Sequence, residues 1–443
     1  MSEAWLTMSA TDLGRGIAKG DIDPVALTQA YLDAAKAHQY SHRIFTTLTA
    51  ERALAEAEAA SERAKLGLRR SMLDGVPISW KDLFDSAGTV TEAGSGLLKG
   101  RVPDADAEVL RNATAMGLVC VGKTHMSELA FSGLGLNPVT ATPPCVNDHD
   151  AVAGGSSSGS ATSVAFGLAA GSIGSDTGGS VRIPSAWNDL VGLKTTIGRV
   201  SVKGSVPLCP RFDTVGPLCR SVEDAAHLLA ALEGTKTADL EGADLEGARL
   251  LVLETAAFDD IRKEPKAGFK AALKRLKKAG AQITYTEIPE VSEALALSGV
   301  LFATEAYAVW QTEIEANPDA MFPEILNRFR SGKDTLAKDF LGAWARLTEL
   351  QAVWAAKTAA FDAVVIPTSP ILPPNLERLM TDSDYYVTEN LLALRNTRIG
   401  NLMGLAGLTL PTGVPSTGIM FLSAPNSEER LLRLGAAAEA ALS

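Results

Sequence analysis

The chain of 443 residues is poor in cysteine and histidine, with four cysteines and five histidines. No two cysteines form a C-x-x-C pair, and none has histidines at the spacing of a zinc site. The sequence therefore gives no reason to expect a metal centre or a disulfide framework. We expect reduced thiols, a cytoplasmic location and no bound metal from the four positions Cys120, Cys145, Cys209 and Cys219.

Basic residues and long apolar runs are also scarce. The 41 lysines and arginines are outnumbered by 52 acidic residues, which gives a net charge of −11. A nucleic acid partner is not expected, because no excess of basic side chains is present to neutralise phosphates. No run of about 18 apolar residues occurs, so no membrane span is predicted. The first residues, MSEAWLTMSATDLGRG, lack the pattern of a signal peptide.

Small residues, in contrast, concentrate in the segment 153–185, AGGSSSGSATSVAFGLAAGSIGSDTGGSVRIPS. Two clusters rich in glycine and serine, 154–160 and 175–180, flank the apolar segment 161–170, which we expect to form a short buried helix. Glycine permits positive φ and close approach of other groups, and serine supplies hydroxyls and helix caps. Two such clusters joined by one helix can surround a single point, as in a catalytic or anion-binding site.

Several interpretations of these clusters compete. Ser157 fits the nucleophile pattern G-x-S-x-G, but no strand is predicted before it, and His227 is the only histidine that follows. A phosphate-binding loop would need G-x-x-x-x-G-K-[ST], which is absent. A flexible linker would not contain an apolar centre. The remaining interpretation is a serine nucleophile that is activated by a group other than histidine.

Lys81 is a candidate for that group. It follows the apolar run 76–80, where an ammonium group is seldom buried without a partner. Such a lysine can form a structural ion pair, or desolvation can lower its pKa so that the neutral amine acts as a base. The two serine-rich clusters favour the second role.

The alternation of short apolar runs with helical segments indicates an α/β fold. Residues 9–67 are predicted to be helical, with Ser9 and Asp23 at helix starts. Strands are predicted near 76–80, 118–123, 249–254, 282–288 and 362–368, and a helix is predicted over 124–130. We therefore expect helices on both faces of a largely parallel or mixed sheet.

Taken together, the motifs resemble those of the amidase signature family, serine amidases that use a Ser–cis-Ser–Lys triad. The similarity rests on LDGVPISWKDLFDSAGTVTEAGS (73–95), GLVCVGKTHMSELAFSGLGLNP (117–138), GGSSSGS, GSDTGGSVRIPSAW and LVGLKTTIGRVS (190–201), in that order. The resemblance implies a three-layer α/β/α fold with a large mixed central sheet. It also implies one amidase domain over 1–443, with a helical cover (1–70), a catalytic core (73–232) and a variable, largely helical entrance region (290–390).

The resemblance also implies a role for each residue of the triad. Ser180 matches the nucleophile, Ser156 matches the bridging serine after a cis bond from Gly155, and Lys81 matches the base. In this scheme the proton passes from Ser180 through Ser156 to the neutral lysine. No metal or organic cofactor is implied.

Neighbouring residues are expected to support this triad. Backbone N–H groups of Thr177, Gly178, Gly179 and Ser180 match the loop that holds the oxyanion. Asp176 is expected to shape this loop. Arg182 either ties the loop down or reaches a substrate carboxylate, and the structural role is favoured. The remaining expected residues are Ser157 and Ser158, as hydrogen-bonding supports, and Ala130, Phe131 and Ser132, as pocket residues or as plain core.

The predicted function is hydrolysis of a linear amide, aryl amides included, through a seryl ester that releases a carboxylic acid and ammonia or an amine. Carbamates and esters suit the same machinery. Two alternatives stay open, the glutaminase subunit of a tRNA-dependent amidotransferase and a non-catalytic scaffold protein. The expected partner is a small-molecule amide, with no nucleic acid and no membrane, and a homodimer is left open.

Overall fold

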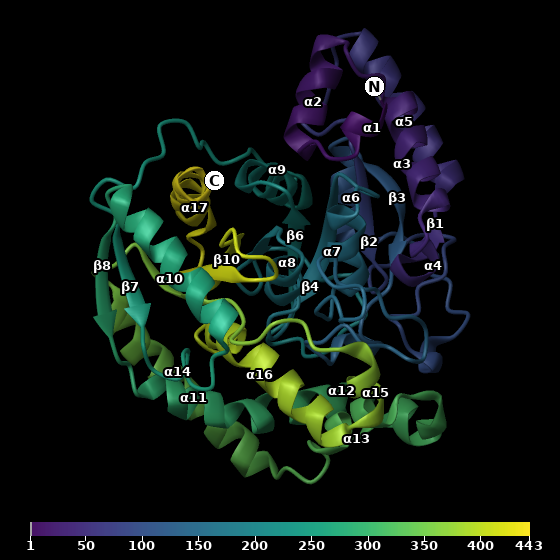
Figure 1. Cartoon of the computed structure of the whole chain (residues 1–443). Helices are drawn as coiled ribbons and strands as arrows, with labels where there is room; N and C mark the ends of the chain where they lie inside the picture. The colour runs from purple at the N-terminus through teal and green to yellow at the C-terminus, as the bar shows by residue number, and fades with distance from the viewer. Residues whose placement is uncertain (1) are drawn as a thin grey trace.

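A single mixed sheet runs through the centre of the molecule (Figure 1). The computed structural model describes residues 2–443, and within them the strand order is β1-β3-β2-β4-β6-β5-β10-β11-β9-β7-β8. The strands are β1 (Phe45–Leu48), β2 (Pro77–Lys81), β3 (Val119–Thr124), β4 (Gly171–Asp176), β5 (Val191–Lys194), β6 (Thr214–Cys219), β7 (Arg249–Leu253), β8 (Gln282–Thr286), β9 (Ala363–Pro367), β10 (Ala406–Pro411) and β11 (Gly418–Ser423).

The sheet combines parallel and antiparallel pairs. Strands β3, β2 and β4 are parallel neighbours, as are β9, β7 and β8, and the remaining neighbours pair in antiparallel orientation. Because β2 and β4 are parallel, their carboxyl ends lie at the same edge of the sheet. Those ends carry Lys81 and the second glycine- and serine-rich cluster.

Helices cover both faces, which confirms the three-layer α/β/α prediction (Figure 1). They are α1 (Ser2–Trp5), α2 (Ala10–Lys19), α3 (Pro24–Ala37), α4 (Ser41–Ile44), α5 (Ala50–Lys65), α6 (Glu108–Ala115), α7 (Ser158–Ala165), α8 (Arg182–Trp187), α9 (Val222–Glu233), α10 (Lys263–Lys278), α11 (Glu290–Ser298), α12 (Thr304–Ala316), α13 (Pro323–Arg330), α14 (Ala337–Thr358), α15 (Leu376–Thr381), α16 (Ser383–Leu402) and α17 (Glu428–Leu442). Short turns of helix are η1 (Gly96–Leu98), η2 (Glu128–Ala130), η3 (Gly299–Ala303) and η4 (Pro318–Ala320).

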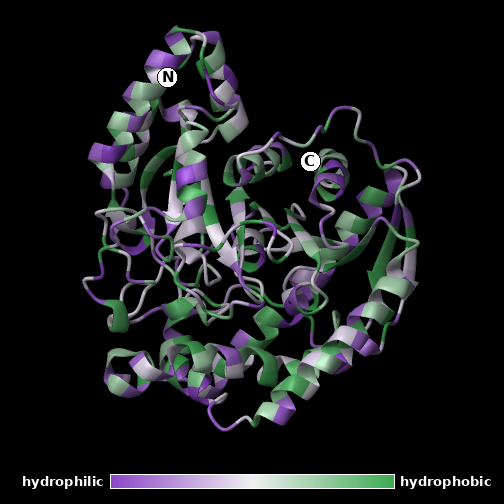
Figure 2. Cartoon of the chain, turned by 180° about the vertical axis from the view of Figure 1, so that it is seen from behind, coloured by the Kyte–Doolittle hydropathy of each residue, from purple (hydrophilic) through white to green (hydrophobic). Residues whose placement is uncertain are grey.

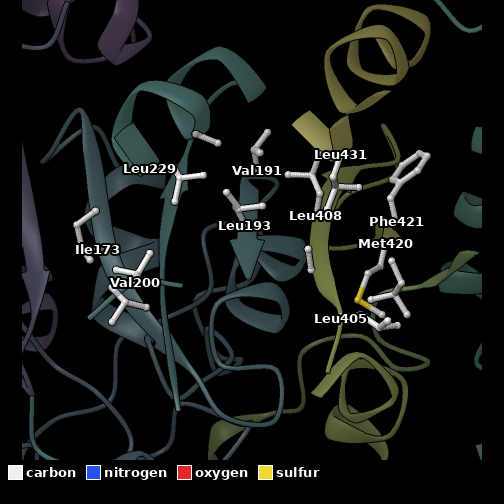
Figure 3. Packing of buried hydrophobic residues seen from close by; sticks show 14 of the residues in the cluster. Ile173, Val191, Leu193, Val200, Leu229, Leu405, Leu408, Met420, Phe421 and Leu431 are labelled. Carbon is white, nitrogen blue, oxygen red and sulfur yellow. The ribbon is translucent and has the colours of Figure 1, made fainter. Parts of the chain in front are cut away.

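Successive residues of β10 show how the two faces are filled. Leu408 lies next to Gly435 of α17, whereas the adjacent Gly407 lies next to Arg182 of α8. This alternation follows from the pleat of a strand, which points successive side chains to opposite faces. Figure 3 shows one part of the resulting core, in which Leu229 and Leu431 pack near strand residues such as Val191 and Leu408.

The N-terminal helices begin where the sequence predicts. The Ser9 side chain accepts a hydrogen bond from the Asp12 amide at the start of α2, and Asp23 accepts from Val25 and Ala26 at the start of α3. Both are N-cap arrangements that satisfy free amides of the first helical turn. Figure 2 shows hydrophilic and hydrophobic residues mixed along the outer helices, as expected for helices with one solvated face.

Three local predictions differ from the structure. The buried helix α7 begins at Ser158, three residues before the predicted segment, and ends at Ala165, before its last five residues. The sequence does not predict strands β4, β5, β6, β10 and β11, because glycine-rich segments such as GSIGSD lack the β-branched pattern of a strand. The helix predicted over 124–130 is only the turn η2, where Leu129 and Ala130 have positive φ.

No helix within residues 2–443 is both long enough and apolar enough to cross a bilayer. The four cysteines are buried and unpaired.

Candidate active site

Lys81 is fully buried at the carboxyl end of β2, where parallel β2 and β4 bring two serines within its reach. Its Nζ atom is hydrogen-bonded to Ser156 Oγ at 2.7 Å and to Ser175 Oγ at 2.8 Å. Burial lowers the pKa of Lys81 to about 7, while the charges of Asp176 and Asp213 act in the opposite direction. A large share of the lysine is therefore neutral near pH 7, as a base requires.

The first cluster forms a loop that leads into α7. The Gly155–Ser156 peptide bond is cis, as the family resemblance implies. The loop is fixed on both sides of this bond, because Gly155 N donates to Gly133 O (2.8 Å) and Ser156 O accepts from Ser127 N (3.1 Å). Ser156 Oγ is thereby held against Lys81.

Serines bind the buried helix α7 to the sheet. Ser163 of α7 shares a hydrogen bond of 2.8 Å with Ser79 of β2, which in turn donates to Ser172 of β4 at 2.8 Å. The predicted supports lie at the start of the same helix, where Ser157 Oγ donates to Ser175 O (3.3 Å) and Ser158 Oγ to His125 O (3.4 Å). Because these hydroxyls are satisfied internally, a polar helix can be fully buried.

The second cluster leaves β4 and turns into α8, and the buried Asp176 sets its shape. The Asp176 carboxylate accepts hydrogen bonds from the amides of Gly179 (2.9 Å) and Val181 (3.2 Å). It also accepts two from the Arg182 guanidinium, at 3.0 and 2.8 Å. Although burial alone would raise it, these interactions lower the pKa of Asp176 to about 2. The carboxylate is therefore charged at every physiological pH.

Arg182 has no donor left for a substrate. Besides Asp176, its guanidinium donates to Thr397 O (2.7 Å) and to Asn401 Oδ1 (2.6 Å), and the side chain is fully buried. Of the two roles expected for Arg182, the geometry favours the structural one, in which it ties the loop to α16.

The sequence predicts four backbone N–H groups that hold the oxyanion, and the structure leaves three of them available. The Gly179 N–H donates to Asp176, so the expectation for Gly179 requires revision. In the part of the chain that the structure describes, the N–H groups of Thr177, Gly178 and Ser180 form no hydrogen bond with a protein acceptor. Gly179 itself has φ of 140°, and a Cβ there would lie 2.1 Å from Thr397 Oγ1. Only glycine fits at this position.

Ser180 lines a small cavity, and its side chain is buried but for 4% of its surface. Lys81 and Ser156 form the first link of the predicted relay, but no hydrogen bond joins Ser180 Oγ to Ser156 among residues 2–443. Catalytic hydrogen bonds are often long in enzymes without substrate and shorten in the complex.

The cavity beside Ser180 has a volume of about 20 Å³ and adjoins a second one of about 100 Å³, with which it shares Ala130, Thr177 and Leu208. The three expected pocket residues line the first cavity. It is lined by Ala130, Phe131, Ser132, Thr177, Gly178, Ser180, Leu208, Phe302, Arg328, Leu394 and Arg398. The second cavity is mostly apolar and reaches Ser175 and Asp213.

Several residues at this site are not predicted from the sequence. Asp213 accepts a hydrogen bond from Thr177 Oγ1 (2.5 Å), and burial raises its pKa. Thr397 of α16 donates to Gly178 O (2.7 Å). Asp213 lies inside a segment that resembles the family, so a signal is present there. Thr397, Arg328 and Arg398 lie outside any recognised motif.

The histidine alternative receives no support from the geometry. His227 of α9 is hydrogen-bonded through Nδ1 to Thr237 Oγ1 at 2.9 Å. Ser157 uses its hydroxyl to bind Ser175 O, and none of its contacts within residues 2–443 is a histidine.

Comparison with known proteins gives the same family as the motifs. The sequence model of the family named Amidase matches residues 26–432. A 2-amino-5-chloromuconic acid deaminase of Comamonas testosteroni is 35% identical over 408 residues, which cover 89% of this chain and 88% of that protein. A subunit of the glutamyl-tRNA(Gln) amidotransferase of Streptococcus pneumoniae (strain 70585) is 29% identical over 95% of this chain and 93% of its own.

A solved structure described as an amidase superposes with a TM-score of 0.87 at 29% identity, covering 98% of this chain and all of the other. Fold, motif order and relatives agree. The chain belongs to the amidase signature family and is a hydrolase of carbon–nitrogen bonds.

Proposed function

We propose that the protein hydrolyses a linear amide by acyl transfer to Ser180, with Ser156 as the proton relay and Lys81 as the base. The observation that carries the proposal is the buried Lys81, whose lowered pKa and 2.7 Å hydrogen bond to Ser156 place a neutral amine at the edge of the Ser180 site. A hydroxyl at its free pKa is a weak nucleophile and needs such a base.

In the first half of the reaction, Ser180 Oγ forms a bond to the amide carbon. Its proton passes to Ser156, and the proton of Ser156 passes to Lys81. The tetrahedral oxyanion is held by the N–H groups of Thr177, Gly178 and Ser180, which lack protein acceptors in the described chain. The carbon–nitrogen bond then breaks, and the proton returns through Ser156 to the leaving nitrogen.

In the second half, water attacks the Ser180 ester and gives its proton to the same relay. The bond between the ester carbon and Ser180 Oγ breaks, and Ser180 regains a proton. The products are a carboxylic acid and ammonia or an amine. Carbamates and esters present the same carbonyl and suit this sequence of steps. The 35% identical relative is named as a deaminase of an organic acid, which supports ammonia as the nitrogen product.

We further propose that residues 1–443 act as one amidase domain in the cytoplasm, and that 290–390 forms the substrate entrance. Arg328 of α13 and Phe302 of η3, both from this region, line the cavity beside Ser180, which supports the entrance assignment. The four unpaired thiols are compatible with a reducing compartment.

A fluorophosphonate probe tests the nucleophile directly. We expect one label per chain on Ser180, found by mass spectrometry of the digested protein, and none on Ser180→Ala. Ser156→Ala and Lys81→Ala should slow labelling and amide hydrolysis by several orders of magnitude, because the three residues act as one unit. His227→Ala is the matched control and should label at the normal rate. Near-normal labelling of Lys81→Ala would contradict the lysine mechanism, and an unlabelled wild-type protein would favour the scaffold alternative.

A further inference from the structure

Two arginines from different helices line the cavity that contains Ser180. Arg328 lies on α13 and Arg398 on α16, and both side chains are partly exposed. Arg398 lies close to the oxyanion loop, since a Cβ built on Gly178 would be 3.7 Å from Arg398 Cγ. The guanidinium groups are near enough that the charge of Arg328 lowers the pKa of Arg398.

Neither arginine has an acidic partner within residues 2–443. Arg328 donates once, to Phe131 O at 2.8 Å, and its guanidinium lies 4.3 Å from the centre of the Phe131 ring. Arg398 forms no hydrogen bond with a described residue and contacts the face of Phe302, at 5.9 Å from the ring centre. In contrast, Arg330 on the same helix as Arg328 pairs with Glu315 at 2.7 Å.

The acids nearest the site are already engaged. Asp176 is bound by Arg182, and Asp213 accepts hydrogen bonds from Thr177 and from the amides of Leu208 and Cys209. Burial lowers the pKa of Arg328 to about 10 and, together with repulsion from Arg328, lowers that of Arg398 to about 9. Both groups are therefore charged at pH 7, and the described lining of the cavity carries two positive charges without a counter-charge.

We propose that the substrate is an amide that carries a carboxylate, and that Arg328 and Arg398 bind this carboxylate while Ser180 attacks the amide carbonyl. The guanidinium fork matches the two oxygens of a carboxylate, and such charge-assisted hydrogen bonds are stronger than neutral ones. The narrow cavity favours a compact anion. This inference rests on the proposed function, because it assigns the substrate class of the same site.

Matched substrates test the proposal. The first series comprises monoamides of dicarboxylic acids with three to six carbons, compared with amides in which a methyl ketone replaces the carboxylate. The second series places the carboxylate on the amine part, as in N-acyl amino acids compared with neutral N-alkyl amides. We expect the anionic member of at least one series to have a kcat/KM about 10–100-fold higher, expressed mainly in KM.

Charge-matched variants locate the effect. Arg328→Gln and Arg398→Gln should each lose most of this preference, and Arg398→Lys should keep part of it. The controls are Arg330→Gln on α13 and Arg395→Gln on α16. Each control removes one positive charge from the same helix as its partner variant and should keep the preference. Melting temperatures establish that all variants are folded.

A binding measurement separates failure of this proposal from failure of the proposed function. Calorimetry with Ser180→Ala protein and glutarate or glutaramide requires no turnover. We expect glutarate to bind at least 10-fold more tightly than the neutral diamide, with the difference lost in the Arg398→Gln background. Equal binding of the two ligands, equal rates in both substrate series, or equal losses in the Arg395→Gln control would each overturn the carboxylate assignment. An enzyme that binds glutarate but does not label at Ser180 would leave the arginine site standing and overturn the catalytic mechanism.

Discussion

Lys81 is the residue whose protonation state controls the proposed chemistry. Because burial lowers its pKa from the ordinary lysine value of 10.5 to about 7, the charged form dominates only below that pH. The protonated lysine cannot accept a proton from Ser156. We therefore expect kcat/KM to rise about tenfold per pH unit below pH 7 and to level off above it. Steady-state rates between pH 5 and 9 measure this profile.

A second group near the cavity could produce a similar limb and must be separated from Lys81. Burial raises the pKa of Glu128 to about 7, and this residue accepts hydrogen bonds from Ser95 Oγ (2.7 Å) and Phe322 N (2.9 Å). Glu128→Gln retains the size and polarity of the side chain but does not titrate. The limb should remain near pH 7 in Glu128→Gln and in His227→Gln. A limb that moves with either substitution would assign the titration to that residue instead of the lysine.

At the scale of elements, α16 holds the oxyanion loop in place from behind. Thr397 Oγ1 donates to Gly178 O at 2.7 Å, and Thr397 O accepts from Arg182. Thr397→Val preserves the shape of the side chain but leaves the Gly178 carbonyl without this partner. We expect kcat to fall about tenfold with little change in KM, less than the roughly 10²–10³ lost with a whole oxyanion donor.

Thr381→Val on the neighbouring helix α15 is the matched control, because Thr381 donates only to carbonyls of its own helix. It should leave both kinetic constants unchanged. A rise in KM without a change in kcat for Thr397→Val would show that α16 acts on substrate binding and not on the loop.

The motifs predict the reacting residues better than the elements that carry them. Lys81, Ser156 and Ser180 each belong to a short motif, and the structure places Lys81 and Ser156 in direct contact. Strand β4 escapes prediction because it is buried on both faces and consists of small residues, so neither alternation nor β-branched enrichment marks it. The helical segment that supplies Arg398 also contains Arg395, and nothing in the sequence separates a cavity residue from a residue outside the cavity.

At the scale of the whole molecule, the cavity charges bear on whether this chain works alone or as a glutaminase subunit. The relative that belongs to an amidotransferase is 29% identical over 95% of this chain, so overall similarity does not decide the question. Free glutamine carries an α-ammonium group as well as a carboxylate. The described lining of the cavity beside Ser180 contains two arginines and no acidic residue. A buried ammonium without a partner beside two guanidinium groups is unfavourable.

We therefore expect the purified chain, without other subunits or tRNA, to hydrolyse glutaramate at least tenfold faster than glutamine in terms of kcat/KM. The two amides differ only in the α-ammonium group, so their ratio reports on that group alone. Released ammonia is measured for both, with Ser180→Ala protein as the blank. Arg398→Gln should reduce the ratio, because it removes one of the two repelling charges together with one of the carboxylate donors. A preference for glutamine, or activity that depends on added partner subunits, would contradict the independent amidase proposed for this chain and identify it as the glutaminase of an amidotransferase.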